Sequence, residues 1–302
     1  MLSKILSTGL PFEKYVSKKI SELGVYPSEQ VPAVWIEGEL PTAKVHESIV
    51  DIVATQHLHV IGPKKRMVLF INFLIECEYR KPNKKWIFFE HIYPKSYDVI
   101  VGKRTSWFLE LVTDTKMKWA NLVSSELSHA IEKHLSFPEA SGFTEIFGEK
   151  RAKFQREDKP FLQAAKGALY HFRDSVELQK IDRSQEIWYE AYIPIVVTTA
   201  EINICKWDYK DINEFEQKAE LSPQNAIIYR LSLPSHITDQ EISMLPIVVL
   251  HSDSLKEFMR RVTNSIRLVL RKRGEQVSET FYVYVGKGIK IKKQSVNQKV
   301  ET

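Results

Sequence analysis

Cysteine is scarce in this chain of 302 residues, which contains only Cys77 and Cys205. Two cysteines are too few for a disulfide framework, and they offer no cysteine-ligated zinc site. Long hydrophobic runs are also missing, because no stretch approaches the roughly 18 to 20 uninterrupted apolar residues that a membrane span needs. The first residues, MLSKILSTGLPF, hold too short an apolar core for a signal peptide. These absences predict a cytoplasmic protein in a reducing compartment, with no membrane partner.

Several catalytic motifs are absent as well. The chain has no phosphate-cradling glycine loop, no GxSxG nucleophile elbow, no Cys/His nucleophile arrangement and no internal repeat. Charge of one sign is only mildly favoured, since 43 Lys and Arg against 38 Asp and Glu give a net charge of +5. This balance is a mild bias toward polyanionic partners.

The hydrophobic pattern predicts an α/β fold. Helical spacing of apolar residues, with Pro11 at the start and Gly24 at the end, indicates a first helix. β-branched and aromatic runs separated by turn residues indicate strands. In order, we expect a helix over 11–24, strands over 31–40, 47–57, 67–79 and 86–92, a helix over 158–172, and two strands within 188–207.

Residues 93–157 interrupt this order with a short β-like piece, a helix near 122–135 and a polar loop, and we interpret them as an insertion. The predicted organisation is a core over 1–207 that carries this insertion, followed by a C-terminal α/β extension over 208–302. We expect the extension to hold short strands, an amphipathic helix that ends at Gly274, and a lysine-rich tail.

Acidic residues in two predicted strands are the main functional signal. The run FLIECEYR ends an apolar strand with Glu76 and Glu78, which share a strand face because side chains alternate. Two like charges so close repel unless a cation lies between them, and a divalent metal is the simplest candidate. Asp51 lies in the β-branched segment ESIVDIVAT, where an unpaired buried carboxylate is costly. We expect Asp51 and the two glutamates to converge at one sheet edge, with Glu47, on the same strand face, as a second-tier candidate.

These residues resemble a known superfamily over roughly 11–207. The FE dipeptide in the first helix, the VDIVA strand and the IECEYR strand end are similar to the PD-(D/E)XK nucleases, in their restriction-endonuclease-like branch with a Mrr-type core. The resemblance implies an αβββαβ core in which Asp51 bridges the metal, Glu76 is the second acid and Glu13 is the acid of the first helix. Gln163 and Lys166 match polar positions of the second core helix.

The chain departs from this pattern at Glu78, where the superfamily usually has lysine. Glu78 could orient or deprotonate the attacking water or hold a second metal, and the cations that could replace the lysine are Lys81, Lys84, Lys85 and Lys166. The resemblance implies a Mg²⁺- or Mn²⁺-dependent endonuclease acting on DNA in restriction or defence, as a possible homodimer with a possible protein partner. RNA as substrate shares every one of these residues. The alternative is an inactive DNA-binding or assembly module whose site decayed with the lysine.

Two further signals have simpler explanations. His57 and His59 have strand spacing suited to a metal, but we place them in a hairpin turn with no third ligand and expect a structural role. The polar face of the last helix carries arginines, which by default form a solvated surface. Their clustering with the lysine-rich tail makes contact with a nucleic-acid backbone the functional alternative, and the candidates are Arg260, Arg267, Arg271 and Lys272.

Overall fold

The computed structural model describes residues 5, 8–37, 44–61, 66–90, 137–147, 151–153, 159–178, 186–206, 209–232, 244–272, 274, 276–279, 282–285 and 288–291. Within these ranges the chain is a mixed α/β fold with four helices. The helices are α2 (Leu10–Ser21), α5 (Lys159–Leu178), α6 (Ile212–Lys218) and α7 (Leu255–Lys272). None of them is long and apolar enough to cross a membrane.

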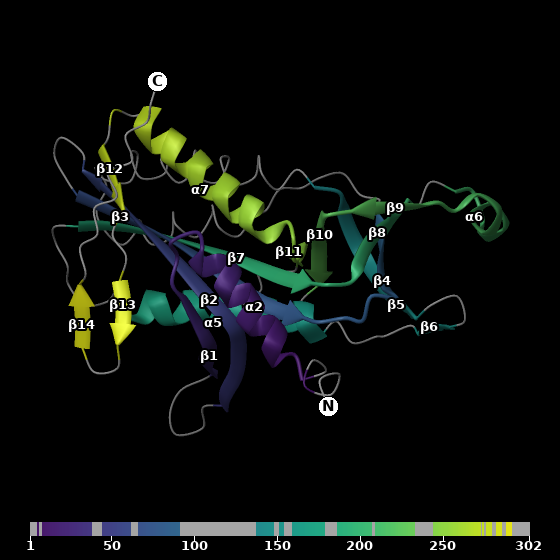
Figure 1. The fold of residues 1–302 in the computed structure, drawn as a ribbon, viewed down its shortest axis with the longest axis horizontal. Helices are drawn as coiled ribbons and strands as arrows, with labels where there is room; N and C mark the ends of the chain where they lie inside the picture. Colours follow the sequence, from purple (N-terminus) through teal and green to yellow (C-terminus); the bar gives the residue numbers. More distant parts are fainter. Residues whose placement is uncertain are drawn as a thin grey trace.

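The strands form one large mixed sheet and a small hairpin (Figure 1). The sheet contains β1 (Pro27–Glu37), β2 (Lys44–Ile61), β3 (Arg66–Glu78), β4 (Lys84–Glu90), β5 (Glu139–Phe147), β6 (Arg151–Lys153), β7 (Glu186–Thr198), β8 (Glu201–Cys205), β9 (Leu221–Gln224), β10 (Ala226–Ser232), β11 (Met244–His251) and β12 (Gln276–Glu279). The hairpin pairs β13 (Tyr282–Val285) with β14 (Gly288–Ile291). Ten strands follow the order β1-β2-β3-β7-β11-β10-β5-β4-β8-β9, while β12 pairs with β2 and β6 with β5.

The part of the sheet that matters for the site is the meander β1-β2-β3 and its neighbour β7. The three meander strands are antiparallel, and β7 pairs with β3 in parallel. Parallel neighbours need a crossover connection, and α5 lies in the chain between β3 and β7. The predicted helix, three strands, further strand, helix and two strands occur in that order, with β4 as the further strand, and two unpredicted strands, β5 and β6, lie between β4 and α5.

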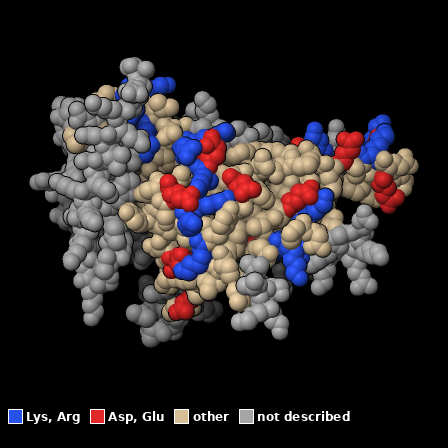
Figure 2. Space-filling view, viewed as in Figure 1, with Lys and Arg blue, Asp and Glu red and all other residues tan. Residues whose placement is uncertain are grey.

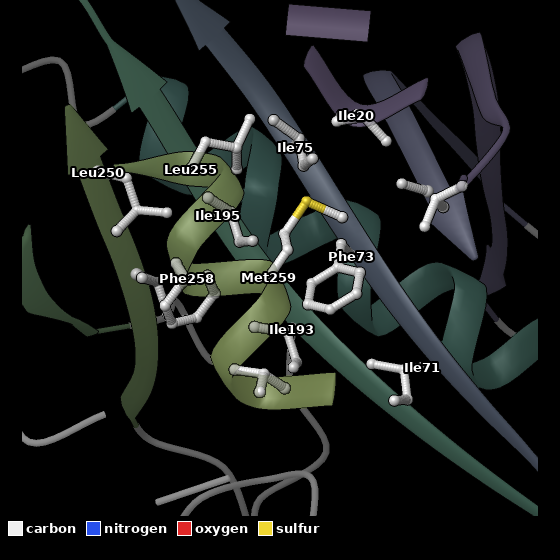
Figure 3. Close-up of a cluster of buried hydrophobic side chains, with 14 of the residues drawn as sticks. Ile20, Ile71, Phe73, Ile75, Ile193, Ile195, Leu250, Leu255, Phe258 and Met259 are labelled. Atoms are coloured by element: carbon white, nitrogen blue, oxygen red, sulfur yellow. The ribbon is translucent and has the colours of Figure 1, made fainter. Parts of the chain in front are cut away.

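Helices cover both faces of the sheet, because its strands are apolar on both sides. Phe73 and Ile75 of β3 pack in a cluster with α2 and α7, whereas Leu74 between them packs in a second cluster with α5. Figure 3 shows Phe258 and Met259 of α7 over the apolar side chains of β3 and β7. The result is a three-layer arrangement with α2 and α7 on one face and α5 on the other (Figure 1).

The helix limits agree with the local sequence. α2 buries Phe12, Val16 and Ile20, and Gly24 follows it with φ 75, a left-handed conformation that glycine adopts without steric cost. At the end of α7, Gly274 has φ 73 and its N–H donates to the Arg271 carbonyl at 3.0 Å. Both predicted glycine stops are confirmed.

Two expectations are corrected by the structure. Residues 139–147, which we took for part of a polar loop, form β5 and pair with β4 and β10 inside the main sheet. His57 and His59 lie within β2, which continues to Ile61, and not in a hairpin turn.

The rest of the predicted insertion, residues 93–136, 148–150 and 154–157, lies outside the described residues, and with it the expected short β-like piece and the helix near 122–135. The division of the chain near residue 207 stays a prediction. The sheet itself is continuous across it, because β10 and β11 lie between β7 and β5.

Candidate functional site

Asp51 and Glu76 meet where β2 and β3 separate. The antiparallel register between these strands runs as far as the pair Ile52 and Ile75, and the next pair along both strands would be Asp51 and Glu76. At this point the Asp51 side chain, and not a backbone carbonyl of β2, accepts the hydrogen bond from β3. Its Oδ2 accepts the Cys77 N–H at 2.8 Å. Two residues that are 25 positions apart in the chain are thereby brought opposite each other.

The backbone around Asp51 is irregular on both strands. Ile52 belongs to the core cluster of α2, but Val50 belongs to the cluster of α5, although residues two apart share a face in a regular strand. β2 therefore changes its buried face at Asp51. Across from it on β1, Gln30 has φ 50, and among the described residues it alone combines a positive φ with a side chain other than glycine. Such distortion re-aims a side chain that would otherwise point into one layer.

Glu13 of α2 joins the site through Gln30. The Gln30 amide Nε2 donates to Glu13 Oε2 at 2.7 Å and reaches Asp51 Oδ1 at 3.4 Å. Burial raises the pKa of Glu13, and the nearby Asp51 raises it further. The predicted acid of the first helix is thus close enough to Asp51 for their charges to interact.

Glu76 is more buried than Glu13, Asp51 or Glu78, with 3% of its surface exposed. Burial, followed by the charges of Asp51 and Glu78, raises its pKa from 4.5 to about 10. Burial also raises the pKa of Asp51, against the opposing effect of the Cys77 N–H, and the two carboxyls hydrogen-bond each other. The Oε1 atom of Glu76 is buried and has no hydrogen-bond partner among the described residues. Two carboxyls this close share a proton at neutral pH. A cation bound between them would compensate their charges better than the proton does.

Glu78 lies at the border of this acidic group and pairs with a cation of its own. Its Oε2 is 2.5 Å from Arg80 Nη1. Burial raises the pKa of Glu78 and Arg80 opposes that shift. The Arg80 guanidinium also lies 3.3 Å from the buried carboxylate of Glu145, which Lys84 contacts at 2.9 Å. A pair of cations therefore adjoins the acids on this side.

The remaining predicted residues are not drawn into the acidic group by any contact in the described part of the chain. Glu47 is exposed on β2 and Lys81 is exposed after β3. Gln163 and Lys166 are half-buried on α5, and no described hydrogen bond or ion pair connects them to the acids. Lys85 pairs with Glu201 at 3.1 Å.

The basic residues of α7 were predicted separately, as candidates for contact with a nucleic-acid backbone. Arg260 pairs with Glu257 at 3.5 Å, while Arg271 and Lys272 are exposed at the end of the helix. Arg267 Nη1 contacts Asn264 Oδ1 at 2.9 Å. On the face that carries α2 and α7, acidic and basic side chains are intermingled (Figure 2).

The donor set suits a hard divalent cation, although it is not preassembled around one. No group of three or more His, Cys, Asp or Glu side chains within the described ranges is arranged to hold a metal ion. The hydrogen bonds explain this, because the Asp51 and Glu76 carboxyls bond each other and the Gln30 amide stands beside Glu13 and Asp51. Mg²⁺ prefers oxygen ligands and needs only one or two carboxylates when water and substrate complete its shell. Two carboxyls with one unpartnered oxygen meet that requirement.

Sequence reasoning missed two participants. Gln30 and Glu145 were not predicted, since each acts through a contact between distant segments. Glu145, which pairs with Arg80, lies on β5, and the sequence did not predict this segment as a strand.

Comparisons with protein-family models, with curated proteins and with solved structures found no match for this chain. What the site does must therefore be argued from its own geometry.

Proposed function

We propose that this chain is a Mg²⁺- or Mn²⁺-dependent endonuclease that hydrolyses phosphodiester bonds in DNA, built on the restriction-endonuclease-like αβββαβ core of the PD-(D/E)XK superfamily. The observation that carries the proposal is the meeting of Asp51 and Glu76 at the separation of β2 and β3, with a buried, unpartnered Glu76 oxygen. The succession of α2, the meander β1-β2-β3, α5 and a parallel β7 supports the core assignment.

Each acid has a distinct role in this proposal. Asp51 and Glu76 hold the cation, and Glu13 contributes a third carboxylate from the helix. A divalent cation bound there would polarise the phosphodiester and lower the pKa of the attacking water. Glu78 would serve as the base, because burial raises its pKa and a carboxylate with a raised pKa is a stronger proton acceptor.

Arg80 takes the place of the usual lysine in this scheme. Lys84 is bound to Glu145, Lys85 to Glu201, and Lys81 points to solvent after the strand. Arg80 is held between Glu78 and Glu145 while 22% of its side chain stays exposed. A guanidinium offers a planar set of donors that matches phosphate oxygens, so Arg80 is suited to contact the substrate next to the acids.

DNA as substrate, a homodimer and a partner in a defence system remain parts of the proposal. Cutting both strands of a duplex takes two active sites, and a dimer supplies them. Of the α7 candidates, Arg260 is paired with Glu257. The last turns of the helix carry Arg267, Arg271 and Lys272 and form its most basic part. We assign backbone contact to this part of α7.

The test is cleavage of supercoiled plasmid in Mg²⁺ or Mn²⁺. We expect nicking by the wild type and its loss in Asp51→Asn and Glu76→Gln. Glu47→Gln is the matched control, because it neutralises an exposed acid of the same strand and is expected to cut normally. Full activity in both site variants contradicts the proposal, and so does cleavage that persists in EDTA.

The inactive module remains the second candidate, and one observation favours it. Glu78 is paired with Arg80, and the other acids are hydrogen-bonded among themselves and to Gln30. A protein of that kind would bind DNA in a salt-dependent way and show no response to Mn²⁺. Thermal unfolding with and without Mn²⁺ separates the two, since only the enzyme is stabilised by the metal and loses that response in Asp51→Asn.

A further inference from the structure

Gln30 occupies an unusual backbone conformation at the edge of the site. Its φ of 50 falls in the left-handed region that residues with a β-carbon avoid. The pairing of β1 with β2 is regular on both sides of it, from Glu29 with Ile52 and from Val31 with Val50, and it lapses at Gln30 itself. Because Gln30 is exposed, core packing does not account for the strain. Strain of this kind persists where a local contact requires it.

The side chain of Gln30 makes the contact that requires the strained backbone. From its distorted position Gln30 sends its amide toward two acids on two other elements, Glu13 Oε2 on α2 at 2.7 Å and Asp51 Oδ1 on β2 at 3.4 Å. An amide nitrogen has two hydrogens, one for each carboxylate. The single side chain therefore joins the helix acid to the strand acid.

The charges make this bridge necessary. Glu13 and Asp51 repel each other, and the charges of Asp51 and Glu29 raise the pKa of Glu13. Glu13 also lies in the first turn of α2, where a carboxylate is free to turn to solvent and toward Lys14. Without a neutral donor between them, the electrostatically favoured arrangement separates the two acids.

We propose that Gln30 is a positioning residue that holds Glu13 within reach of the cation site of Asp51 and Glu76, and that the strained backbone is retained for this purpose. The inference rests on the proposed function, because it assumes that a divalent cation binds there. Groups that orient metal ligands without touching the metal change metal affinity by about 10- to 100-fold when they are removed.

The variant that separates this role from a purely structural one is Gln30→Gly. Glycine accepts the left-handed conformation without strain, so the melting temperature is expected to stay the same or rise, while the amide bridge is lost. Gln30→Asn is the second variant, because asparagine also tolerates positive φ but its amide is one methylene too short to serve both acids. Ser28→Gly is the matched control, an exposed position of the same strand with regular pairing to Val53.

The measurement is the Mn²⁺ dissociation constant by isothermal titration calorimetry at fixed pH. We expect Gln30→Gly and Gln30→Asn to weaken Mn²⁺ binding by about 10-fold or more. Ser28→Gly is expected to bind as the wild type does. In a Glu13→Gln background, Gln30→Gly should cause little further loss, because the two residues act through the same carboxylate.

The outcomes are distinct. Wild-type Mn²⁺ affinity in Gln30→Gly, together with lost binding in Asp51→Asn, overturns the role of Gln30 and leaves the proposed function standing. Equal losses from Gln30→Gly with and without Glu13→Gln overturn the route through Glu13. A wild type that binds no Mn²⁺ overturns the proposed function, and the positioning role falls with it.

Discussion

Replacing Glu76 by glutamine is expected to stabilise the metal-free protein while it destroys the function proposed for the site. The substitution keeps the shape of a side chain that is 3% exposed and removes its ability to ionise. In the folded protein burial and the neighbouring acids raise the pKa of Glu76 to about 10, against an ordinary value of 4.5. At pH 7.5 the folded protein therefore holds a proton that the unfolded chain has released.

The size of the effect follows from this difference. A group whose pKa is raised by folding contributes most stability below its unfolded value, and that contribution is lost as pH rises from about 4.5 toward 10. At about 1.36 kcal/mol per pKa unit, pH 7.5 lies roughly 3 units up this slope, which sets a ceiling of about 4 kcal/mol. The glutamine amide must itself find partners, so we expect a net gain of about 1 to 3 kcal/mol at pH 7.5 and little or no gain at pH 5.

The assay is urea unfolding in EDTA at pH 5, 7 and 9 for the wild type and Glu76→Gln. Other raised acids, such as Glu13 and Asp51, are present in both proteins, so the difference between the two curves isolates Glu76. A difference that does not grow with pH, or a variant that is less stable at every pH, refutes the reasoning. Adding Mn²⁺ should reverse the order, because the metal stabilises only the protein that binds it.

Two further predictions concern neighbouring features. Arg80→Ala should weaken DNA binding in EDTA and reduce the steepness of log K against log salt by about 0.9, the value for one lost phosphate contact. Lys85 is an exposed cation paired with Glu201, so Lys85→Ala should change the steepness less. An unchanged slope in Arg80→Ala would show that it serves only its carboxylate partners. Gly167→Ala should cost about 1 to 3 kcal/mol in urea unfolding, because its β-carbon would lie 2.4 Å from Val50 Cγ2. Gly142→Ala, with a nearest approach of 3.4 Å, is the control, and equal stabilities would contradict the packing of α5 on β2.

The acids of the site could be predicted from the sequence because each breaks a local pattern. Asp51 interrupts a β-branched run and Glu76 ends an apolar one, and a charge in a buried strand is costly unless it is matched. Strand alternation then limits which residues share a face. The helices α2 and α7 could be predicted for a similar reason, since their apolar spacing and terminal glycines are local signals.

The partners of these acids could not be predicted, because they depend on tertiary contacts. In the sequence Gln30 is an ordinary polar residue just before the predicted strand over 31–40, and only the change of buried face at Asp51 gives its side chain two carboxylates to join. Glu145 lies on a strand whose polar and apolar residues do not alternate cleanly, and it meets Arg80 only because β5 pairs with β4. Long-range strand pairing also placed β10 and β11 inside the sheet that we had assigned to the core alone.

The central claim is that Asp51 and Glu76 together bind one divalent cation. Anomalous diffraction from crystals soaked in Mn²⁺ tests it most directly. We expect a single anomalous peak between the two carboxylates, at about 2.0 to 2.5 Å from an oxygen of each, with the hydrogen bond between the carboxyls broken. Carboxyls that remain hydrogen-bonded to each other, with no anomalous peak between them at saturating Mn²⁺, would contradict it.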